Sequence, residues 1–173
     1  MDFFNEHIVK AYKRPLDYLI ILGSLVLAYL LISIILAFEG FIPSLMLLEI
    51  AGVIYGVYWV ISSTSVEFEY SLTNEQFDVD KIIAKKRRKR VISVNARDFE
   101  YLAPVADKYA DVFNDKSIAK RIDASCRRLT ARHCFAIFYV NGEKTCLVFE
   151  PTDKMLEKFK TTVPRSLNFT MEG

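Results

Sequence analysis

The residues of this 173-residue chain that could do chemistry are few and scattered. It has three cysteines, Cys126, Cys134 and Cys146, and two histidines, His7 and His133, with no CxxC pair and no Cys/His spacing typical of zinc sites. An odd cysteine count argues against a disulfide framework and favours a reducing compartment. Two arginines follow Cys126 and could lower its pKa, but a lone cysteine with one distant histidine is usually inert. We therefore expect no metal and no cofactor.

Enzyme motifs are missing as well. The chain contains no GxSxG, HExxH or P-loop motif, and its six glycines form no dinucleotide-binding turn. The carboxylates of Glu67, Glu69, Asp78 and Asp80 alternate with other residues, as expected on the solvated face of strands. The sequence therefore predicts a protein that is not an enzyme and has no catalytic residues.

Glu49 is an ionisable residue inside an otherwise apolar stretch. Between residues 18 and 61 the only other formally charged residue is Glu39. A carboxyl group at mid-depth in a membrane must be protonated, paired or hydrated, and Tyr29 or Ser33 on a neighbouring helix would lie near its level. Two interpretations stay open: a neutral carboxyl satisfied within the hairpin or an oligomer, and a role in ion or substrate movement through an oligomer.

A run of six basic residues is the sharpest electrostatic feature. It places charge on both faces of an extended segment, so it is expected at a sheet edge, in a loop or against an anionic surface. The membrane surface is the favoured ligand because each basic residue near an anionic leaflet contributes on the order of 1 kcal/mol. Edge protection and an acidic partner are alternatives, whereas nucleic acid is disfavoured because no stacking aromatics interleave. The run consists of Lys85, Lys86, Arg87, Arg88, Lys89 and Arg90.

Two apolar stretches must position these residues. Residues 18–38 and 41–61 are each long enough to cross a bilayer, because a helix of 21 residues rises roughly 30 Å. The short turn at 39–40 makes the two helices antiparallel neighbours. A signal peptide is disfavoured by the length of the first stretch, and a buried soluble hairpin by the small size of the remaining domain.

Small residues indicate how these helices could touch. Gly52 and Gly56 form a GxxxG motif in the second stretch, and Ser24 and Ala28 form a similar pattern in the first. Packing within the hairpin, packing between copies of the chain, and no packing role all remain open.

Flanking charges predict the orientation. Basic residues precede the first stretch and follow the second, which places both termini in the cytoplasm and makes the chain a multi-pass cell-membrane protein. Within residues 1–17, Phe4, Ile8 and Tyr12 recur at helical spacing beside basic residues, as in an amphipathic segment at the membrane interface. A frayed basic tail is the alternative.

Residues 62–173 read as a soluble domain. Residues 66–72 alternate with period two, Asn141-Gly142 is a strong hairpin signal, and Thr152 or Asp153 can cap a final amphipathic helix. About seven short strands followed by a helix predict an α+β fold in which an antiparallel barrel or sandwich is capped by a C-terminal helix.

Several short motifs also carry a resemblance. Tyr-Ser-Leu-Thr at 70–73, Phe-Asp-Val at 77–79 and Val-Ile-Ser-Val at 91–94 resemble the opening of bacterial pleckstrin-homology-like (PH-like) domains, which often follow two membrane helices. The ending, at 141–151 and 155–159, is similar to that of a family of small bacterial membrane proteins with the same layout.

The resemblance implies a binding or scaffolding module held at the inner leaflet. Its partners would be anionic membrane lipids, a protein or a second copy of the chain. Phosphoinositide binding is not implied, because the first hairpin carries Asn74 and Glu75 where lipid-binding members have basic residues. The alternative function is a small oligomeric transport or membrane-assembly subunit that uses Glu49 within the membrane.

Overall fold

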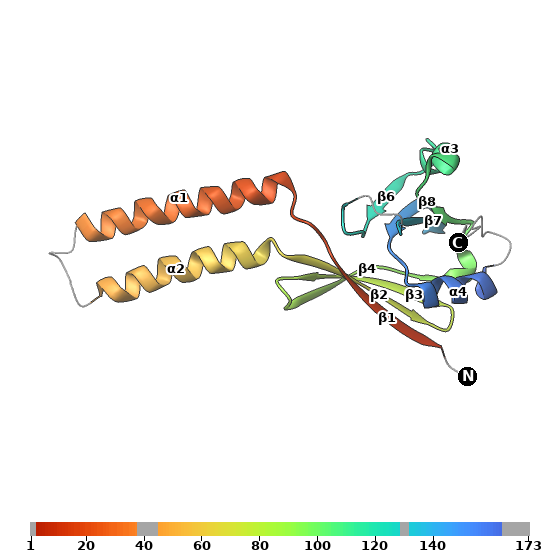
Figure 1. Ribbon diagram of the computed structural model, residues 1–173, viewed down its shortest axis with the longest axis horizontal. Coiled ribbons are helices and arrows are strands. Elements are labelled where there is room, and N and C mark those ends of the chain that lie inside the picture. Colours follow the sequence, from red (N-terminus) through yellow and green to blue (C-terminus); the bar gives the residue numbers. More distant parts are fainter. Residues whose placement is uncertain (1–2, 38–44, 129–131, 164–173) are drawn as a thin grey trace. The chain divides into compact units, whose positions relative to one another are not determined.

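The computed structural model describes residues 3–37, 45–128 and 132–163 (Figure 1). They divide into two compact units, which are described separately. The helical unit comprises residues 13–66 and 83–86, and the β unit comprises residues 1–12, 67–82 and 87–173. The predicted turn at 39–40 lies outside the described residues.

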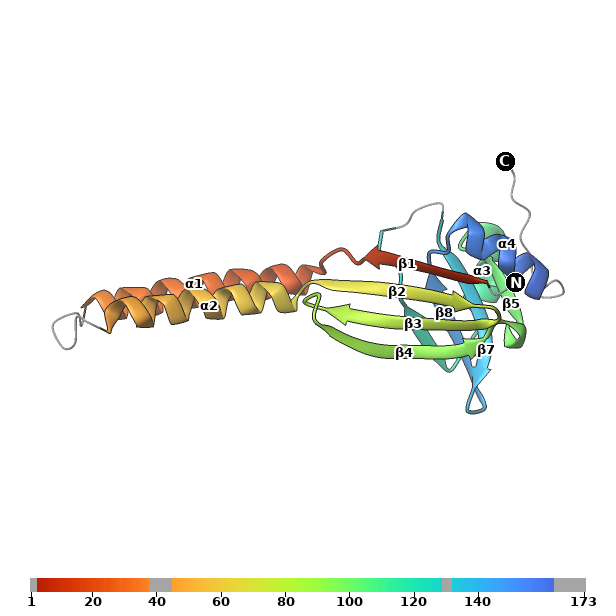
Figure 2. The ribbon, with the colours of Figure 1, turned by 90° about the horizontal axis from the view of Figure 1, so that it is seen from below.

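The helical unit consists of α1 (Pro15–Ala37) and α2 (Met46–Ser63), which lie side by side (Figures 1 and 2). Proline suits the first turn of α1, and the Asp17 carboxylate accepts a hydrogen bond of 2.7 Å from the Arg14 amide at this end. Both helices are long and apolar enough to cross a membrane. Ala28 is their one buried side chain, so these are not the core helices of a soluble domain.

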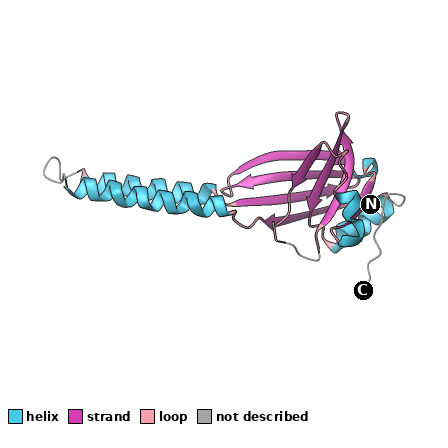
Figure 3. Cartoon of the chain, turned by 90° about the horizontal axis from the view of Figure 1, so that it is seen from above, coloured by secondary structure: helices cyan, strands magenta, loops and turns pink. Residues whose placement is uncertain are grey.

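The β unit contains two four-stranded sheets, and neither is closed into a barrel (Figure 3). Strand order is β1-β2-β3-β4 in the first sheet and β5-β7-β8-β6 in the second. The strands are β1 (Phe4–Lys10), β2 (Val66–Thr73), β3 (Gln76–Ile83), β4 (Arg87–Asn95), β5 (Tyr101–Pro104), β6 (Lys120–Asp123), β7 (Cys134–Val140) and β8 (Glu143–Phe149). The helical segments are 3₁₀ turns at Ala96–Asp98 and Asp107–Tyr109, α3 (Ala110–Phe113) and α4 (Asp153–Thr162). The helix-capped sandwich is confirmed, but β6 pairs with β8 in parallel, which the antiparallel prediction did not include.

The N-terminal segment corrects the prediction of an amphipathic helix within residues 1–17. Residues 4–10 instead form β1, which pairs antiparallel with β2 from Phe4↔Thr73 to Lys10↔Glu67. A spacing of four residues, as between Phe4 and Ile8, puts side chains on one face of a strand as well as of a helix. The predicted domain also does not begin at residue 62. The β unit includes residues 1–12, because the helical hairpin is inserted between its paired strands β1 and β2.

Aromatic side chains join the two sheets to α4. Phe77 of β3 lies 5.1 Å from Phe149 of β8 and 5.5 Å from Phe159 of α4, measured between ring centroids, and all three are fully buried. The amide of Met155 donates to Thr152 Oγ1 at 3.2 Å, which confirms the predicted helix cap. The helix therefore covers the core between the sheets.

The second sheet is buried on both faces. Five consecutive residues of β7, Cys134 to Phe138, are buried. On one face, Phe135 and Ile137 pack under residues of the connection between β5 and β6, including Tyr109 and Phe113. The 3₁₀ turn at Asp107–Tyr109 and α3 supply this cover.

Candidate functional site

The basic run lies in a turn and at a sheet edge, which are among the positions expected for it. Lys85 and Lys86 belong to the turn between β3 and β4, and the remaining four residues begin β4, an edge strand. Ala84 and Lys85 both have positive φ, 55° and 56°, and the amide of Lys86 donates to the carbonyl of Ile83 at 3.1 Å. This is the geometry of a tight two-residue hairpin turn, formed here without glycine.

Two arginines of the run are held by carboxylates. Arg88 Nη2 lies 2.5 Å from Glu69 Oε2, and Arg90 contacts both Asp80 and Asp78, the latter at 3.0 Å. Glu69 and Asp80 are buried, 5% and 7% exposed, so the expected solvated row of carboxylates is wrong for these two residues. The sequence pattern could not show this, because each carboxylate is covered by an arginine from a later part of the chain.

Charge and burial shift the pKa values of Arg90 and Glu69. The hydrogen bond to Asp80 raises the pKa of the Arg90 guanidinium. Burial and a hydrogen bond with Glu6 raise the pKa of Glu69, although the positive charge of Arg88 opposes the shift. The pairing with arginine therefore does not fully offset the cost of burying Glu69.

The other four cations of the run, Lys85, Lys86, Arg87 and Lys89, are exposed and form no ion pair with any described residue. The turn that carries the two lysines belongs to the helical unit. Within it, the amide of Ala84 donates to the carbonyl of Ser65 at 2.9 Å, two residues beyond the end of α2. The lysines are thus fixed close to one end of a membrane-length helix.

Glu49 lies in the first turn of α2 and is exposed. Its side chain makes no hydrogen bond or ion pair within the described part of the chain. Ser33 Oγ instead donates to the Tyr29 carbonyl at 2.9 Å, and the Tyr29 side chain is 72% exposed. Because α2 begins at Met46, Glu49 is near the N-terminus of this helix. Glu49 is thus not at the middle of α2, and its predicted depth within a membrane stays a prediction.

The small residues of the helices surround a cavity. Ser24, Ala28, Gly52 and Gly56 all line a space of 410 Å³ between α1 and α2. A Cβ atom added to Gly52 or Gly56 would meet nothing within 4 Å. The glycines therefore do not bring the two backbones together, which leaves packing between copies or no packing role among the predicted alternatives.

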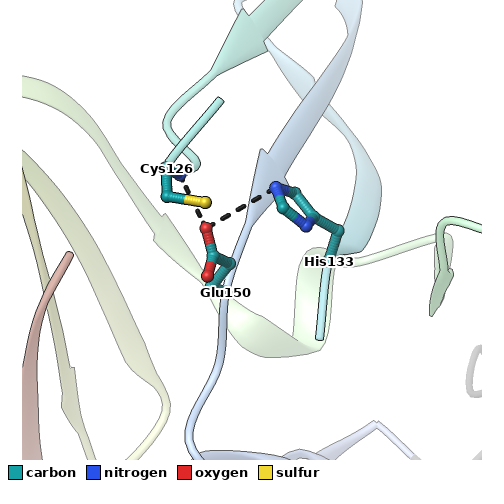
Figure 4. Close-up of side chains that lie close together, drawn as sticks. All are labelled: Cys126, His133 and Glu150. Carbon is teal, nitrogen blue, oxygen red and sulfur yellow. Dashed lines mark hydrogen bonds and ion pairs between the residues drawn. The ribbon is translucent and has the colours of Figure 1, made fainter. Parts of the chain in front are cut away.

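Three further residues meet where strand ends of the second sheet converge: Cys126, His133 and Glu150 (Figure 4). Cys126 follows β6, Glu150 follows β8, and His133 precedes β7. Parallel pairing of β6 with β8 puts their final residues at one edge, and antiparallel β7 begins there. Sequence reasoning missed this cluster, since the parallel pairing leaves no short-range signal.

The cluster is compact and largely withdrawn from solvent. Glu150 Oε1 accepts a hydrogen bond of 2.6 Å from the Cys126 amide and lies 3.5 Å from His133 Nε2. Cys126 and His133 are 8% and 4% exposed. Burial and the hydrogen bond with Glu150 raise the pKa of the Cys126 thiol, which is the opposite of what an activated nucleophile requires.

The Cys126 loop also holds the segment that leads into α1. The amide of Tyr12 donates to the Cys126 carbonyl at 2.9 Å, and Arg127 Nη1 donates to the Tyr12 carbonyl at 3.0 Å. The Arg128 guanidinium lies 4.3 Å from the centroid of the Tyr12 ring. Beside this loop is a cavity of 320 Å³ lined by His133, Arg127 and Arg128, among others.

Two helices long and apolar enough to cross a membrane, inserted into a two-sheet, helix-capped domain, are compatible with a membrane protein that carries a PH-like domain. The chain belongs to the bacterial PH-like domain family DUF6106, whose family model matches residues 1–169. The match covers β1 and both helices, in agreement with the insertion. No curated protein and no solved structure matches the chain significantly. Membership of this family points to a binding or scaffolding module, since PH-like domains are typically not catalytic.

Proposed function

We propose that this protein is a non-enzymatic, membrane-anchored binding module that holds its PH-like domain at the inner leaflet of the cell membrane and presents it to anionic lipid or a protein partner. The observation that carries the proposal is the basic turn. Lys85 and Lys86 have no acidic partner among the described residues, and their turn is hydrogen-bonded to the segment that follows α2.

Electrostatics supports lipid headgroups as the ligand of this turn. Each basic residue near an anionic leaflet contributes on the order of 1 kcal/mol, so two lysines held near the end of a membrane helix add a substantial preference. Arg87 and Lys89 can extend the contact. Arg88 and Arg90 cannot contribute fully, because their charges are matched by buried carboxylates.

Chain connectivity supports cytoplasmic termini. Lys10 pairs with Glu67, and only residues 11–14 and 64–65 connect these paired strands to α1 and α2. A chain that leaves one strand, crosses a membrane twice and returns to the neighbouring strand must have both ends on the same side. The positive-inside bias of the flanking residues assigns that side to the cytoplasm.

The alternative of a transport subunit loses its supporting observation. That alternative is an oligomeric transport or membrane-assembly subunit that uses Glu49 within the membrane, and Glu49 lies in the first turn of α2 rather than near its middle. We therefore retain the binding module as the proposed function.

The test uses the full-length chain, because a fragment that starts at Val66 would lack β1. The protein is placed in nanodiscs of zwitterionic lipid or of lipid with an anionic fraction, and lysine labelling by an amine-reactive reagent is followed by mass spectrometry. We expect anionic lipid to slow the labelling of Lys85 and Lys86, and salt to reverse the effect.

Exposed lysines of α4, Lys154 and Lys160, provide the internal control. A contact of anionic lipid with the basic turn should slow the labelling of Lys85 and Lys86 more than that of these two lysines. Equal labelling of Lys85 and Lys86 in both kinds of disc, at low salt, would reject the lipid contact.

A further inference from the structure

We propose that Cys126, His133 and Glu150 form a binding site for one divalent transition-metal ion of the zinc class. The ligands are the Cys126 thiolate, a His133 ring nitrogen and a Glu150 carboxylate oxygen. This site is independent of the lipid contact and lies entirely within the β unit.

The donor set fits the metal. Zinc is borderline soft and is bound by cysteine sulfur, histidine nitrogen and carboxylate oxygen, usually with four ligands in a tetrahedral arrangement. Three protein ligands leave one position for water. The 320 Å³ cavity that His133 also lines gives room for such a water.

The distances fit as well. With metal bonds of about 2.0–2.1 Å, the nitrogen and oxygen ligands of a tetrahedral site are separated by roughly 3.3–3.4 Å. His133 Nε2 and Glu150 Oε1 are 3.5 Å apart, and the three ligand atoms all lie within 4.8 Å of one another. The Cys126 sulfur lies within 4.8 Å of both atoms, and a change of its side-chain torsion can bring it to the separation of about 3.5 Å that a tetrahedral site requires.

The site is built by rigid elements and a supporting hydrogen bond. Asp123 pairs with Val148 and Cys134 with Phe149, so every ligand lies within three residues of a paired strand position. The Cys126 amide fixes the Glu150 carboxylate, in the way that supporting hydrogen bonds orient metal ligands. In Figure 4 the Cys126 sulfur and the His133 ring both lie beside this carboxylate.

A bound ion would also tighten the connection to the membrane anchor. The Cys126 carbonyl accepts the Tyr12 amide, and Tyr12 is three residues before α1. Fixing Cys126 therefore reduces opening of the hydrogen bond that holds Tyr12, which amide exchange measures.

The test titrates Co²⁺ into the chelator-treated, full-length protein in detergent. We expect one ion per chain, with a thiolate-to-cobalt charge-transfer band and the visible bands of a tetrahedral site. Added Zn²⁺ should displace the Co²⁺ and remove these bands. Cys126→Ser should remove the charge-transfer band, and Glu150→Gln and His133→Gln should each weaken binding at least about tenfold. Amide exchange at Tyr12 should slow on metal binding, and that of Lys86 should not.

Matched controls come from the same chain. Cys134→Ser and Cys146→Ser remove buried free thiols elsewhere in the domain, and His7→Gln removes the other histidine; all three should bind the metal normally. Circular dichroism checks the folding of each variant. Absence of the charge-transfer band, its persistence in Cys126→Ser, or full affinity in folded Glu150→Gln and His133→Gln would overturn the site.

Discussion

The two ends of the basic run differ in how their charges are used. Arg88 and Arg90 lie against the buried carboxylates of Glu69 and Asp80, whereas Lys85 and Lys86 are exposed in a turn without acidic neighbours in the described structure. Arginine can present a planar fork to a carboxylate, while lysine carries a compact, strongly hydrated charge. A run of six cations therefore contains structural charges at one end and available charges at the other.

The largest effect on stability should come from removing an arginine that is paired with buried carboxylates. Arg90→Met leaves Asp80 buried beside the like charge of Asp78. Loss of one member of a fully buried ion pair costs about 3–5 kcal/mol, and since the Arg90 side chain is 51% exposed we expect a smaller loss, about 2 kcal/mol in the free energy of unfolding. Denaturant unfolding of the full-length protein in detergent measures this.

Lys89→Met provides the control, because Lys89 has the same charge on the same strand and forms no ion pair with a described residue. Its effect should stay within about 0.5 kcal/mol, as for most surface substitutions. Similar losses in the two variants would erase the distinction between the two ends of the run.

A smaller effect should come from the turn at the other end. Lys85→Gly relieves a left-handed conformation that costs a non-glycine residue about 1–2 kcal/mol, but the added flexibility of the unfolded chain offsets part of this gain. We expect the free energy of unfolding to rise by about 0.5–1 kcal/mol. The protection of Lys86 from amine labelling by anionic lipid should fall, because the turn loses one charge.

Ala84→Gly separates the gain in stability from the loss of lipid protection. Ala84 has nearly the same φ as Lys85 but no charge, so the variant should gain similar stability and keep the lipid protection of both lysines. If both variants lost lipid protection equally, the shape of the turn rather than its charge would govern the contact.

Features set by neighbouring residues could be predicted from the sequence. Asn141 and Gly142 take positive φ, 52° and 83°, in the hairpin turn, and Thr152 caps α4. The apolar lengths of the two helices follow equally from local pattern, and the charge on both faces of the basic run excluded an interior strand. Residues 4–10 could not be assigned so easily, because their strand partners lie 57 to 69 positions further along the chain and their spacing fits a helix as well.

The candidate sites divide in the same way. Which residues of the basic run are available to a ligand depends on Glu69, Asp78 and Asp80, which form ion pairs with Arg88 and Arg90 of a later strand. The Cys126 cluster depends on the parallel pairing of β6 and β8, and the absence of a zinc spacing pattern said nothing about it. Motif spacing detects ligands carried on one turn or helix, and not ligands that sheet topology brings together.

The smallest effect should appear in the pH dependence of stability. Burial and the hydrogen bond with Glu6 raise the pKa of Glu69 above 4.5, the value for an unfolded chain. The folded protein therefore binds this proton more tightly, and the free energy of unfolding declines as pH rises from 4.5 through the raised pKa. Glu69→Gln cannot titrate and should flatten this part of the profile, measured as thermal midpoints between about pH 4 and 7.

Arg88→Met and Lys85→Met turn this profile into a test of the two ends of the run. Removing Arg88 abolishes the attraction that opposes the shift, so the pKa of Glu69 should rise further and the decline should extend to higher pH. Removing Lys85, which has no contact with Glu69, should leave the profile unchanged, since exposed charges at longer range are screened by salt. Equal changes would mean that Glu69 responds to the summed field of the basic run, and the pairing of Arg88 with Glu69 would then have no separate energetic role.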